Sequence, residues 1–191
     1  MRRAPVSPHL PHVPSLAQVY AQLESIGVPT PHWGWHDHTD GATAHELVQV
    51  EDGIEIRGKR INKPFVEKPV DAEDHNVYVY YPDSVGGGSK RLFRKVADQS
   101  SQFYPGENSL RTDGAYIYEE FLPTEGTDVK VYTVGPNYAY AEARKSPTLD
   151  GRVVRNQAGK EVRYPVLLTG TEKELARRIV IGFGQVRIAP W

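Results

Sequence analysis

The chain has 191 residues, of which 39% are hydrophobic and 25% are charged, and its formal net charge is −1. This length suits one domain with a real core, and the charge argues against a globally basic nucleic-acid-binding protein. There is no cysteine, which excludes disulfides, and no apolar run approaches the roughly 18 residues of a membrane-spanning helix.

The first fourteen residues have the composition of a tail. Four prolines recur with the three-residue period of polyproline II: Pro5, Pro8, Pro11 and Pro14. A Pro-x-x-P ligand for an SH3-type domain is an alternative, whereas the prolines argue against the amphipathic helix of a transit peptide. We expect residues 1–14 to form a disordered leader.

Two helices are expected, one near each end of the folded region. Ser15-x-x-Gln18 is a capping box before apolar residues at helical spacing, and Gly27 suits the C-terminal cap. A second capping box, Thr171-x-x-Glu174, predicts a helix that starts there. Each helix would flank the strands that lie between them.

The polar segment 31–44 holds three histidines, His32, His36 and His38. A zinc site is one interpretation, but no cysteine or ordered carboxylate completes a ligand set. We therefore predict a solvated loop here.

Strands are expected at 47–50, 54–56, 64–70, 77–81 and 91–96, where short apolar or alternating runs occur. The first two flank a short turn, in which Gly53 supplies a position for positive φ. The strand at 77–81 should pair with that at 91–96. These elements predict an α+β fold that is mainly antiparallel sheet with flanking helices.

The glycine run Gly86–Ser89 joins two of these strands. It is not a P-loop, because no helix or Gly-Lys-Ser/Thr follows, and it is either a plain hairpin turn or a loop whose amides approach a phosphate. On an extended strand the four basic residues that follow would alternate, with Arg91 and Lys95 on one face and Lys90 and Arg94 on the other. Charge on both faces beside a glycine loop favours ligand phosphates over solvent.

A hairpin is predicted from 128 to 146, with its turn at residues 135–137. This register places Asp128 opposite Arg144 and Lys130 opposite Glu142, and leaves a valine/alanine face against a core. The charged face is either a ligand platform or a structural ladder of ion pairs.

A strand is predicted at 116–121, and it ends just before Pro123. Its terminal backbone groups could bind an adenine edge beside Phe121 and Leu122, although a plain core strand explains the composition equally well.

Between Phe65 and Pro147 the blocks VEKPV, AEDHNVY, RLFRK, YIYEEF, GTDVKVYTVG and AEARKSP resemble one known family. It is the ATP-grasp kinase domain of the diphosphoinositol-pentakisphosphate kinases, also called Vip-type inositol hexakisphosphate kinases. The resemblance implies an ATP-grasp-like fold, incomplete at both ends, with residues 15–185 as a partial kinase domain and 186–191 as a tail outside the family pattern.

The resemblance also implies a cytosolic kinase that transfers the ATP γ-phosphate to a phosphate of inositol hexakisphosphate or its diphospho derivative, forming inositol pyrophosphates. Because the acceptor is itself a phosphate, the barrier would be mostly charge repulsion, relieved by cations and Mg²⁺. No metal ligand is assigned in this chain, since the family carries its Mg²⁺ ligands beyond the point where this chain ends.

The site residues implied by the resemblance fall into two overlapping sets. ATP would be contacted by Lys68, His75, Arg94, Glu119, Glu120, Phe121, Leu122, Asp128, Val129, Lys130 and Ser146. The inositol polyphosphate would be contacted by Arg94, Lys95, Lys130 and Arg144. Arg94, Lys130 and Arg144 are the candidate catalytic residues.

Two alternatives remain for function. Without the family's metal ligands and its preceding α/β domain, this chain alone is expected to lack kinase activity, and it would then be a catalytically dead module that binds nucleotide or inositol polyphosphate. An RNA-binding surface around Tyr78, Tyr80, Tyr81 and Phe93 is the weakest hypothesis, since the chain as a whole is not basic. The sequence leaves the phosphorylated ring position and the oligomeric state open.

Overall fold

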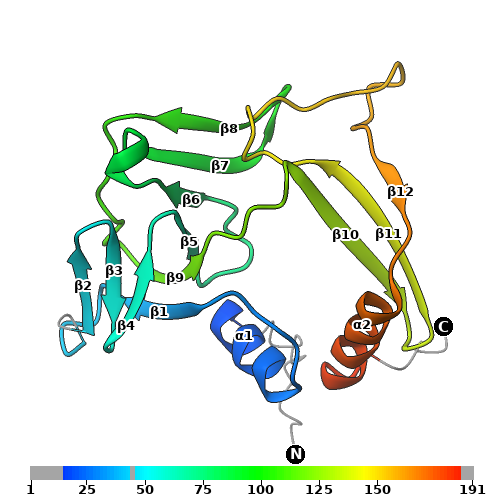
Figure 1. Cartoon of the computed structure of the whole chain (residues 1–191), viewed down its shortest axis with the longest axis horizontal. Helices are drawn as coiled ribbons and strands as arrows, with labels where there is room; N and C mark the ends of the chain where they lie inside the picture. Colours follow the sequence, from blue (N-terminus) through cyan, green and yellow to red (C-terminus); the bar gives the residue numbers. More distant parts are fainter. Residues whose placement is uncertain (1–14, 44–45, 186–191) are drawn as a thin grey trace, which may run out of the picture.

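The computed structural model describes residues 15–43 and 46–185, so the predicted leader and the predicted tail lie outside the described residues. Within these ranges the chain forms two α-helices, one short 3₁₀ helix (Asp83–Val85) and three antiparallel sheets (Figure 1). The α+β prediction is confirmed, with antiparallel sheet as the dominant element. No helix of the described residues is long and apolar enough to cross a membrane.

The largest sheet has six strands. In spatial order they are β1 (Trp33–Asp37), β9 (Ala115–Glu120), β5 (Phe65–Pro69), β6 (Val77–Tyr80), β7 (Ser89–Val96) and β8 (Gln99–Tyr104). The predicted pairing of β6 with β7 is confirmed, with Val77 opposite Leu92. The strand β8, which was not predicted, is polar along most of its length.

The prediction of a solvated loop at 31–44 is wrong for its first half. That half contains β1, which pairs with β9 at the edge of the sheet, and His36 is only 2% exposed. Histidine is a polar residue, but its ring packs well against other rings. The rings of His36 and His38 pack edge-on, with 4.6 Å between their centroids. Composition alone therefore gave the wrong environment for this segment.

A small second sheet contains β2 (Leu47–Val50), β3 (Gly53–Ile56) and β4 (Lys59–Asn62). The predicted turn between β2 and β3 is present, but its positive φ of 49° falls on Asp52 and not on Gly53. Gly53 is required for a different reason. A Cβ at this position would lie 2.7 Å from the carbonyl oxygen of Ile61 on the neighbouring strand.

The third sheet consists of β10 (Thr127–Val134), β11 (Tyr138–Lys145) and β12 (Tyr164–Val166). The predicted hairpin register is confirmed at every pair from Asp128–Arg144 to Val134–Tyr138. The expectation of a buried valine/alanine face holds only for the alanines. Val129 and Val131 are 52% and 41% exposed, because on their side the hairpin and the second helix leave an open groove of about 460 Å³.

Helix α1 (Leu16–Ser25) begins at the predicted capping box of Ser15 and Gln18. Helix α2 (Gly170–Gly182) begins two residues before the predicted position, with its box formed by Thr169 and Glu172. Thr169 has the extended backbone that an N-cap needs, whereas the similar Thr171-x-x-Glu174 pattern already lies inside the helix. The two helices lie near each other below the sheets (Figure 1), and Gln22 donates a hydrogen bond to the carbonyl of Gly182.

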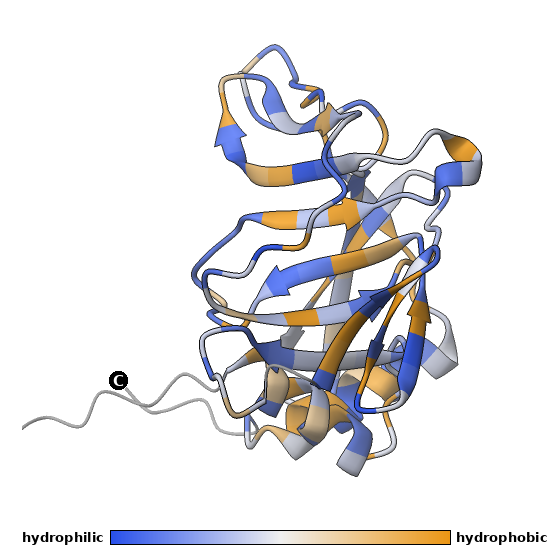
Figure 2. Cartoon of the chain, turned by 90° about the vertical axis from the view of Figure 1, so that its left-hand side faces the viewer, coloured by the Kyte–Doolittle hydropathy of each residue, from blue (hydrophilic) through white to orange (hydrophobic). Residues whose placement is uncertain are grey.

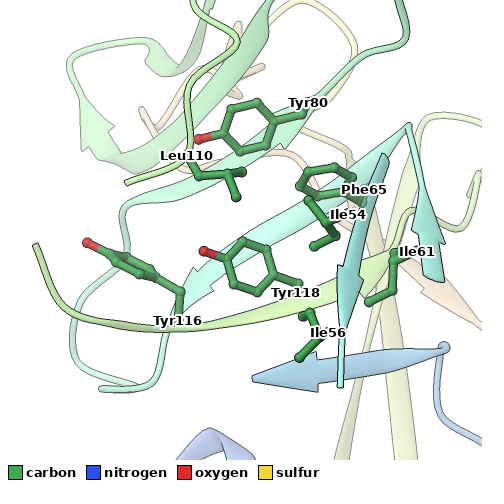
Figure 3. Close-up of a cluster of buried hydrophobic side chains, with 8 residues drawn as sticks. All are labelled: Ile54, Ile56, Ile61, Phe65, Tyr80, Leu110, Tyr116 and Tyr118. Carbon is green, nitrogen blue, oxygen red and sulfur yellow. The ribbon is translucent and has the colours of Figure 1, made fainter. Parts of the chain in front are cut away.

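The core lies between one face of the six-stranded sheet and the small sheet. Figure 3 shows Phe65, Tyr80 and Tyr118 gathered in one cluster with the isoleucines of β3 and β4. Because side chains alternate along a strand, the residues between these aromatics point to the opposite face of the sheet. Figure 2 shows this alternation of hydrophobic and hydrophilic positions along the strands. The opposite face carries the candidate functional site.

Candidate functional site

A pocket of about 270 Å³ opens on the second face of the six-stranded sheet. Its apolar lining comes largely from Val66, Val77, Val79 and Leu92, which project from the central strands. Seven of the residues predicted to contact ATP line this pocket: Lys68, Glu119, Glu120, Phe121, Leu122, Asp128 and Ser146. Residues from β5, β9, β10 and the end of β11 thus meet around one hollow.

Lys68 projects into this pocket with a counter-charge already in place. Its ammonium forms an ion pair with the carboxylate of Glu119 and donates to the hydroxyl oxygen of Tyr20 at 3.3 Å. The Tyr20 hydroxyl in turn donates to Glu119. Glu119 therefore already balances the charge of Lys68 in the absence of a ligand.

The Tyr20–Glu119–Lys68 triad joins helix α1 to the pocket. Burial first, and then the adjacent Glu119 carboxylate, raise the pKa of Tyr20, so its phenol remains a proton donor. Only 27% of the Lys68 side chain and 8% of the Glu119 side chain are exposed. The triad fixes the lysine at the pocket wall while leaving part of its ammonium accessible.

The end of β9 has one backbone amide available to a ligand. The amides of Glu120 and Phe121 donate to the carbonyls of His32 and Pro64, at 2.8 and 3.2 Å. By contrast, the amide of Leu122 donates to no other residue within the described part of the chain, and the Leu122 side chain is half exposed. If an adenine edge binds at this strand end, Leu122 supplies the donor.

A second cavity, of about 500 Å³, adjoins the first. Val77, Leu92 and Asp128 line both hollows, so the two are contiguous. Five arginine and lysine side chains line the second cavity against two carboxylates: Arg94, Lys95, Arg144, Lys145 and Arg152 against Asp128 and Glu161. In a chain of net charge −1, this local excess of three positive charges would attract an anion.

The basic residues of β7 fall into two groups. Lys90 and Arg91 make contacts within the protein, whereas Arg94 and Lys95 line the second cavity. Lys90 donates to the carbonyls of Thr148 and Leu149, at 2.6 and 2.8 Å, and Arg91 stacks on Tyr104 at 4.2 Å. Beyond Leu92 the pairing with β8 shifts register. The predicted alternation is consequently wrong after this bulge, which lets Arg94 and Lys95 line the same cavity.

The glycine run belongs to neither cavity. The amides of Gly86 and Gly87 donate to backbone carbonyls at 2.9 and 3.0 Å, and the amide of Gly88 donates to the Asn108 side chain at 2.7 Å. A Cβ on Gly88 would lie 2.7 Å from the Tyr104 carbonyl oxygen. The glycines allow a tight turn at positive φ, so the hairpin-turn interpretation is confirmed and the phosphate-loop interpretation is wrong.

The hairpin β10–β11 supplies the far wall of both cavities. Arg144 lies between two carboxylates, 3.4 Å from Asp128 and 3.7 Å from Glu161. Lys130 lines a separate hollow of about 340 Å³ on the same face, together with Arg144 and Arg163. Val129 projects to the opposite face, toward the groove beside α2. The structure therefore does not bring Lys130 or Val129 to the nucleotide-sized pocket.

His75 and Arg94, the other two residues predicted to contact ATP, line the basic cavity. His75 precedes β6 and Arg94 lies on β7, and Arg94 also donates to the carbonyl of Glu73 at 3.1 Å. The structure thus places the predicted ATP residues in two adjoining hollows, apart from Val129 and Lys130.

No protein-family model matches the chain. It is 57% identical over 170 residues to inositol hexakisphosphate and diphosphoinositol-pentakisphosphate kinase 1 of Rattus norvegicus, covering 88% of this chain and 12% of the relative. It is 54% identical over 169 residues to inositol hexakisphosphate and diphosphoinositol-pentakisphosphate kinase VIP1 of Arabidopsis thaliana, covering 88% of this chain and 16% of the relative. It is 62% identical over 140 residues to the Caenorhabditis elegans kinase, covering 73% of this chain and 10% of the relative.

The chain belongs to this inositol hexakisphosphate and diphosphoinositol-pentakisphosphate kinase family. It spans about an eighth of the length of the relatives it matches. The resemblance drawn from the sequence blocks is confirmed.

Several residues of the basic cavity in this family member were not predicted. They are Lys145, Arg152 and Glu161, together with Arg163 in the adjoining hollow. Lys145 stands inside the AEARKSP block, so it was available from sequence. The other three belong to the segment between β11 and β12, whose isolated bridges Gln99–Arg152 and Arg155–Glu161 give no local periodic signal.

The described residues hold no group of three or more histidine, aspartate or glutamate side chains placed to bind a metal ion. In the predicted histidine cluster, His38 instead shares a hydrogen bond of 2.8 Å with the Tyr118 hydroxyl. Burial lowers the pKa of His38, and its neighbour His36 lowers it further. The zinc interpretation has no support in this part of the chain.

Proposed function

We propose that this chain forms the nucleotide- and polyphosphate-binding part of an ATP-grasp kinase that produces inositol pyrophosphates. The observation that carries the proposal is the contiguity of an apolar pocket containing Lys68 with a cavity lined by five cations. The names of the relatives supply the substrate class, inositol hexakisphosphate and diphosphoinositol pentakisphosphate. Taken together the two contiguous hollows have the size of a small-molecule site, and the cations of the second suit a dense polyanion.

In this proposal the nucleotide base lies against Val66, Val79 and Phe121, with its edge on the Leu122 amide. Lys68 contacts the phosphate chain from β5, and Asp128 and Ser146 line the side formed by the hairpin. Arg94 and His75 line the basic cavity, near the residues that the two hollows share, and they would contact the terminal phosphate. This arrangement clasps ATP between the six-stranded sheet and the β10–β11 hairpin, as an ATP-grasp fold requires.

The reaction transfers one phosphoryl group between phosphates. An oxygen of the acceptor phosphate forms a bond to the γ-phosphorus of ATP, while the bond from that phosphorus to the β,γ-bridging oxygen breaks and ADP leaves. The attacking oxygen is already anionic, so no strong base is needed and the barrier is dominated by repulsion between phosphates. Arg94, Lys95 and Arg144 would lower this repulsion by neutralising charge on donor and acceptor.

Mg²⁺, if bound with ATP, would neutralise charge on the phosphates. At the junction of the two hollows the described residues offer one carboxylate, Asp128, which is paired with Arg144 at 3.4 Å. This set does not fit a divalent cation by itself, so no step is assigned to a metal here.

A chimeric kinase tests the proposal. The aligned segment of the rat relative is replaced by the matching segment of this chain, and the chimera is supplied with ATP, Mg²⁺ and inositol hexakisphosphate. We expect a diphosphoinositol product, and we expect Arg144→Ala within the chimera to remove most of it. The matched control is Arg178→Ala on α2, which breaks only an exposed ion pair with Glu174.

A folded chimera that binds both ligands without forming product would support the binding-module alternative instead.

The RNA hypothesis loses part of its basis, because Tyr80 is fully buried and Tyr78 packs against the same core cluster. Neither ring is available as a stacking platform.

A further inference from the structure

Glu161 is surrounded by cations at the wall of the basic cavity. Its carboxylate lies 2.6 Å from the Lys95 ammonium, 3.3 Å from the Arg163 guanidinium and 3.7 Å from that of Arg144. Only 14% of the Glu161 side chain is exposed. One carboxylate therefore occupies the point where three cations of the cavity and the adjoining hollow converge.

The electrostatics of this position are those of a bound anion. Burial alone would raise the pKa of Glu161, but the hydrogen bond and charge of Lys95, together with Arg144 and Arg163, lower it below its ordinary value. The carboxylate is thus held ionised at neutral pH. Its contacts with a lysine and two arginines are the contacts that a ligand phosphate would make in the same place.

The segment that carries Glu161 lies outside the continuous sheets, and its first part is held by backbone hydrogen bonds of Ser100 with Gly151 and of Val153 with Asp98. It lies between β11 and β12 and is joined to its surroundings by the isolated bridges Gln99–Arg152 and Arg155–Glu161. Arg155 ties it to the end of β7 and β8 through an exposed pair with Asp98 and a bond to the Ala97 carbonyl. Outside a continuous sheet, a small movement of this segment or of one side chain separates Glu161 from the cations.

We propose that Glu161 is a built-in counter-ion of the polyphosphate site. It holds Lys95 and Arg144 in place while the site is empty, and a polyphosphate displaces it when it binds. This inference rests on the proposed function, since it takes the basic cavity as the site of the inositol polyphosphate. Glu161 would then act as a positioning residue that competes with the substrate, and it would favour ligands with enough charge to separate it from its partners.

The test compares the 191-residue chain with its Glu161→Gln variant. Inositol hexakisphosphate is titrated calorimetrically at several salt concentrations, and the thermal unfolding midpoint is measured with and without it. We expect about three- to tenfold tighter binding by the variant, because the competing charge is gone. We also expect a steeper loss of affinity with salt, because more cations are free to pair with the ligand. The variant without ligand should unfold at a lower temperature, and the ligand should raise that temperature more than in the wild type.

Glu73→Gln is the matched control. It also neutralises one carboxylate beside a cavity cation, since Glu73 pairs with Arg94 at 3.7 Å, but its side chain is 84% exposed. We expect less than about a twofold change in affinity. Equal or weaker binding by Glu161→Gln would overturn the inference and leave Glu161 with a structural role. Failure of the wild-type chain to bind inositol hexakisphosphate would instead contradict the proposed function.

Discussion

Two networks of buried carboxylates and cations lie on opposite faces of the six-stranded sheet. On the core face, Glu67 is 0% exposed and pairs with Arg111 at 2.6 Å, and the Arg111 guanidinium lies between the rings of Tyr78 and Tyr116, at 4.1 and 4.4 Å. On the other side, Glu161 pairs with Lys95, Arg144 and Arg163 at the wall of an open cavity. The residue types are the same, but only the second network leaves cations facing a hollow.

The comparison shows how an ion pair in the core differs from one at the wall of an open cavity. Around Arg111, two aromatic rings and Glu67 occupy the space that a ligand would need, so the charge serves only the fold. Around Glu161, three cations share one carboxylate and keep unused hydrogen-bonding capacity toward the cavity. Loss of the first network should therefore appear in stability, and loss of the second should appear in binding.

The largest expected effect is on the core network. Arg111→Met removes the only cation paired with Glu67 among the described residues and leaves a buried carboxylate without compensation. We expect the free energy of unfolding to fall by about 3–5 kcal/mol, measured by urea titration. The double variant with Glu67→Gln should recover part of this loss, because it removes the buried charge. A loss below about 1 kcal/mol for Arg111→Met would mean that the Glu67–Arg111 pair contributes no more to stability than an exposed ion pair.

The next effect concerns Lys68. Lys68→Met keeps much of the side-chain volume and deletes a charge-assisted contact worth about 1.5–3 kcal/mol, so nucleotide affinity should fall at least about tenfold. Tyr20→Phe should weaken nucleotide binding less, because it only loosens the Glu119 partner of Lys68. Isothermal titration with a non-hydrolysable ATP analogue measures both, with exposed Lys59→Met as the control. Unchanged affinity in a folded Lys68→Met variant would mean that this lysine only snorkels to solvent.

The two halves of β7 allow a smaller but sharper comparison. Lys90→Met removes two hydrogen bonds to carbonyls and should cost about 1–3 kcal/mol of stability. Arg94→Ala should cost less than about 0.5 kcal/mol, because its side chain is 67% exposed, yet it should weaken inositol hexakisphosphate binding. Urea unfolding measures the stability of both variants, and calorimetric titration measures their affinity for inositol hexakisphosphate. The reverse pattern would mean that the bulge does not separate structural from ligand-binding cations.

The smallest expected effect is a difference in pH dependence between the two glutamates. Burial raises the pKa of Glu67 despite Arg111, so the stability that Glu67 contributes is greatest in acid and falls as pH rises through the carboxyl range. The pKa of Glu161 is lowered, so its contribution is present at neutral pH and is lost as pH falls.

The stability difference between wild type and Glu67→Gln should therefore shrink from about pH 4 to 7, whereas that for Glu161→Gln should grow. Unfolding free energies at four or five pH values give both slopes. Parallel slopes for the two variants would contradict the assignment of the two networks.

Local patterns in the sequence were sufficient for the hairpin and for most residues of the apolar pocket. The register of β10 and β11 follows from the turn at Gly135 and the alternation of charge, and it is reproduced pair by pair. The family blocks identified Lys68 and residues 119–122, and these residues line the same pocket in the structure. These features depend on residues that are close together in the chain or lie within a motif.

The features that were missed depend on contacts between distant segments. The bulge in β7 arises from its pairing with β8, a polar strand without a hydrophobic signal. The counter-charge of Lys68 comes from β9 and its orientation from α1, and Glu161 reaches the cavity from a segment without a periodic pattern. None of these partners can be identified by spacing along the chain.

The central claim is that two contiguous hollows bind two different ligands, a nucleotide and an inositol polyphosphate. The most direct test titrates the wild-type chain, Lys68→Met and Arg144→Ala separately with a non-hydrolysable ATP analogue and with inositol hexakisphosphate. We predict a crossed result, in which Lys68→Met loses nucleotide affinity and keeps inositol hexakisphosphate affinity, while Arg144→Ala does the opposite. Equal losses of both affinities in each folded variant, or loss of nucleotide affinity alone in Arg144→Ala, would contradict the two-ligand account.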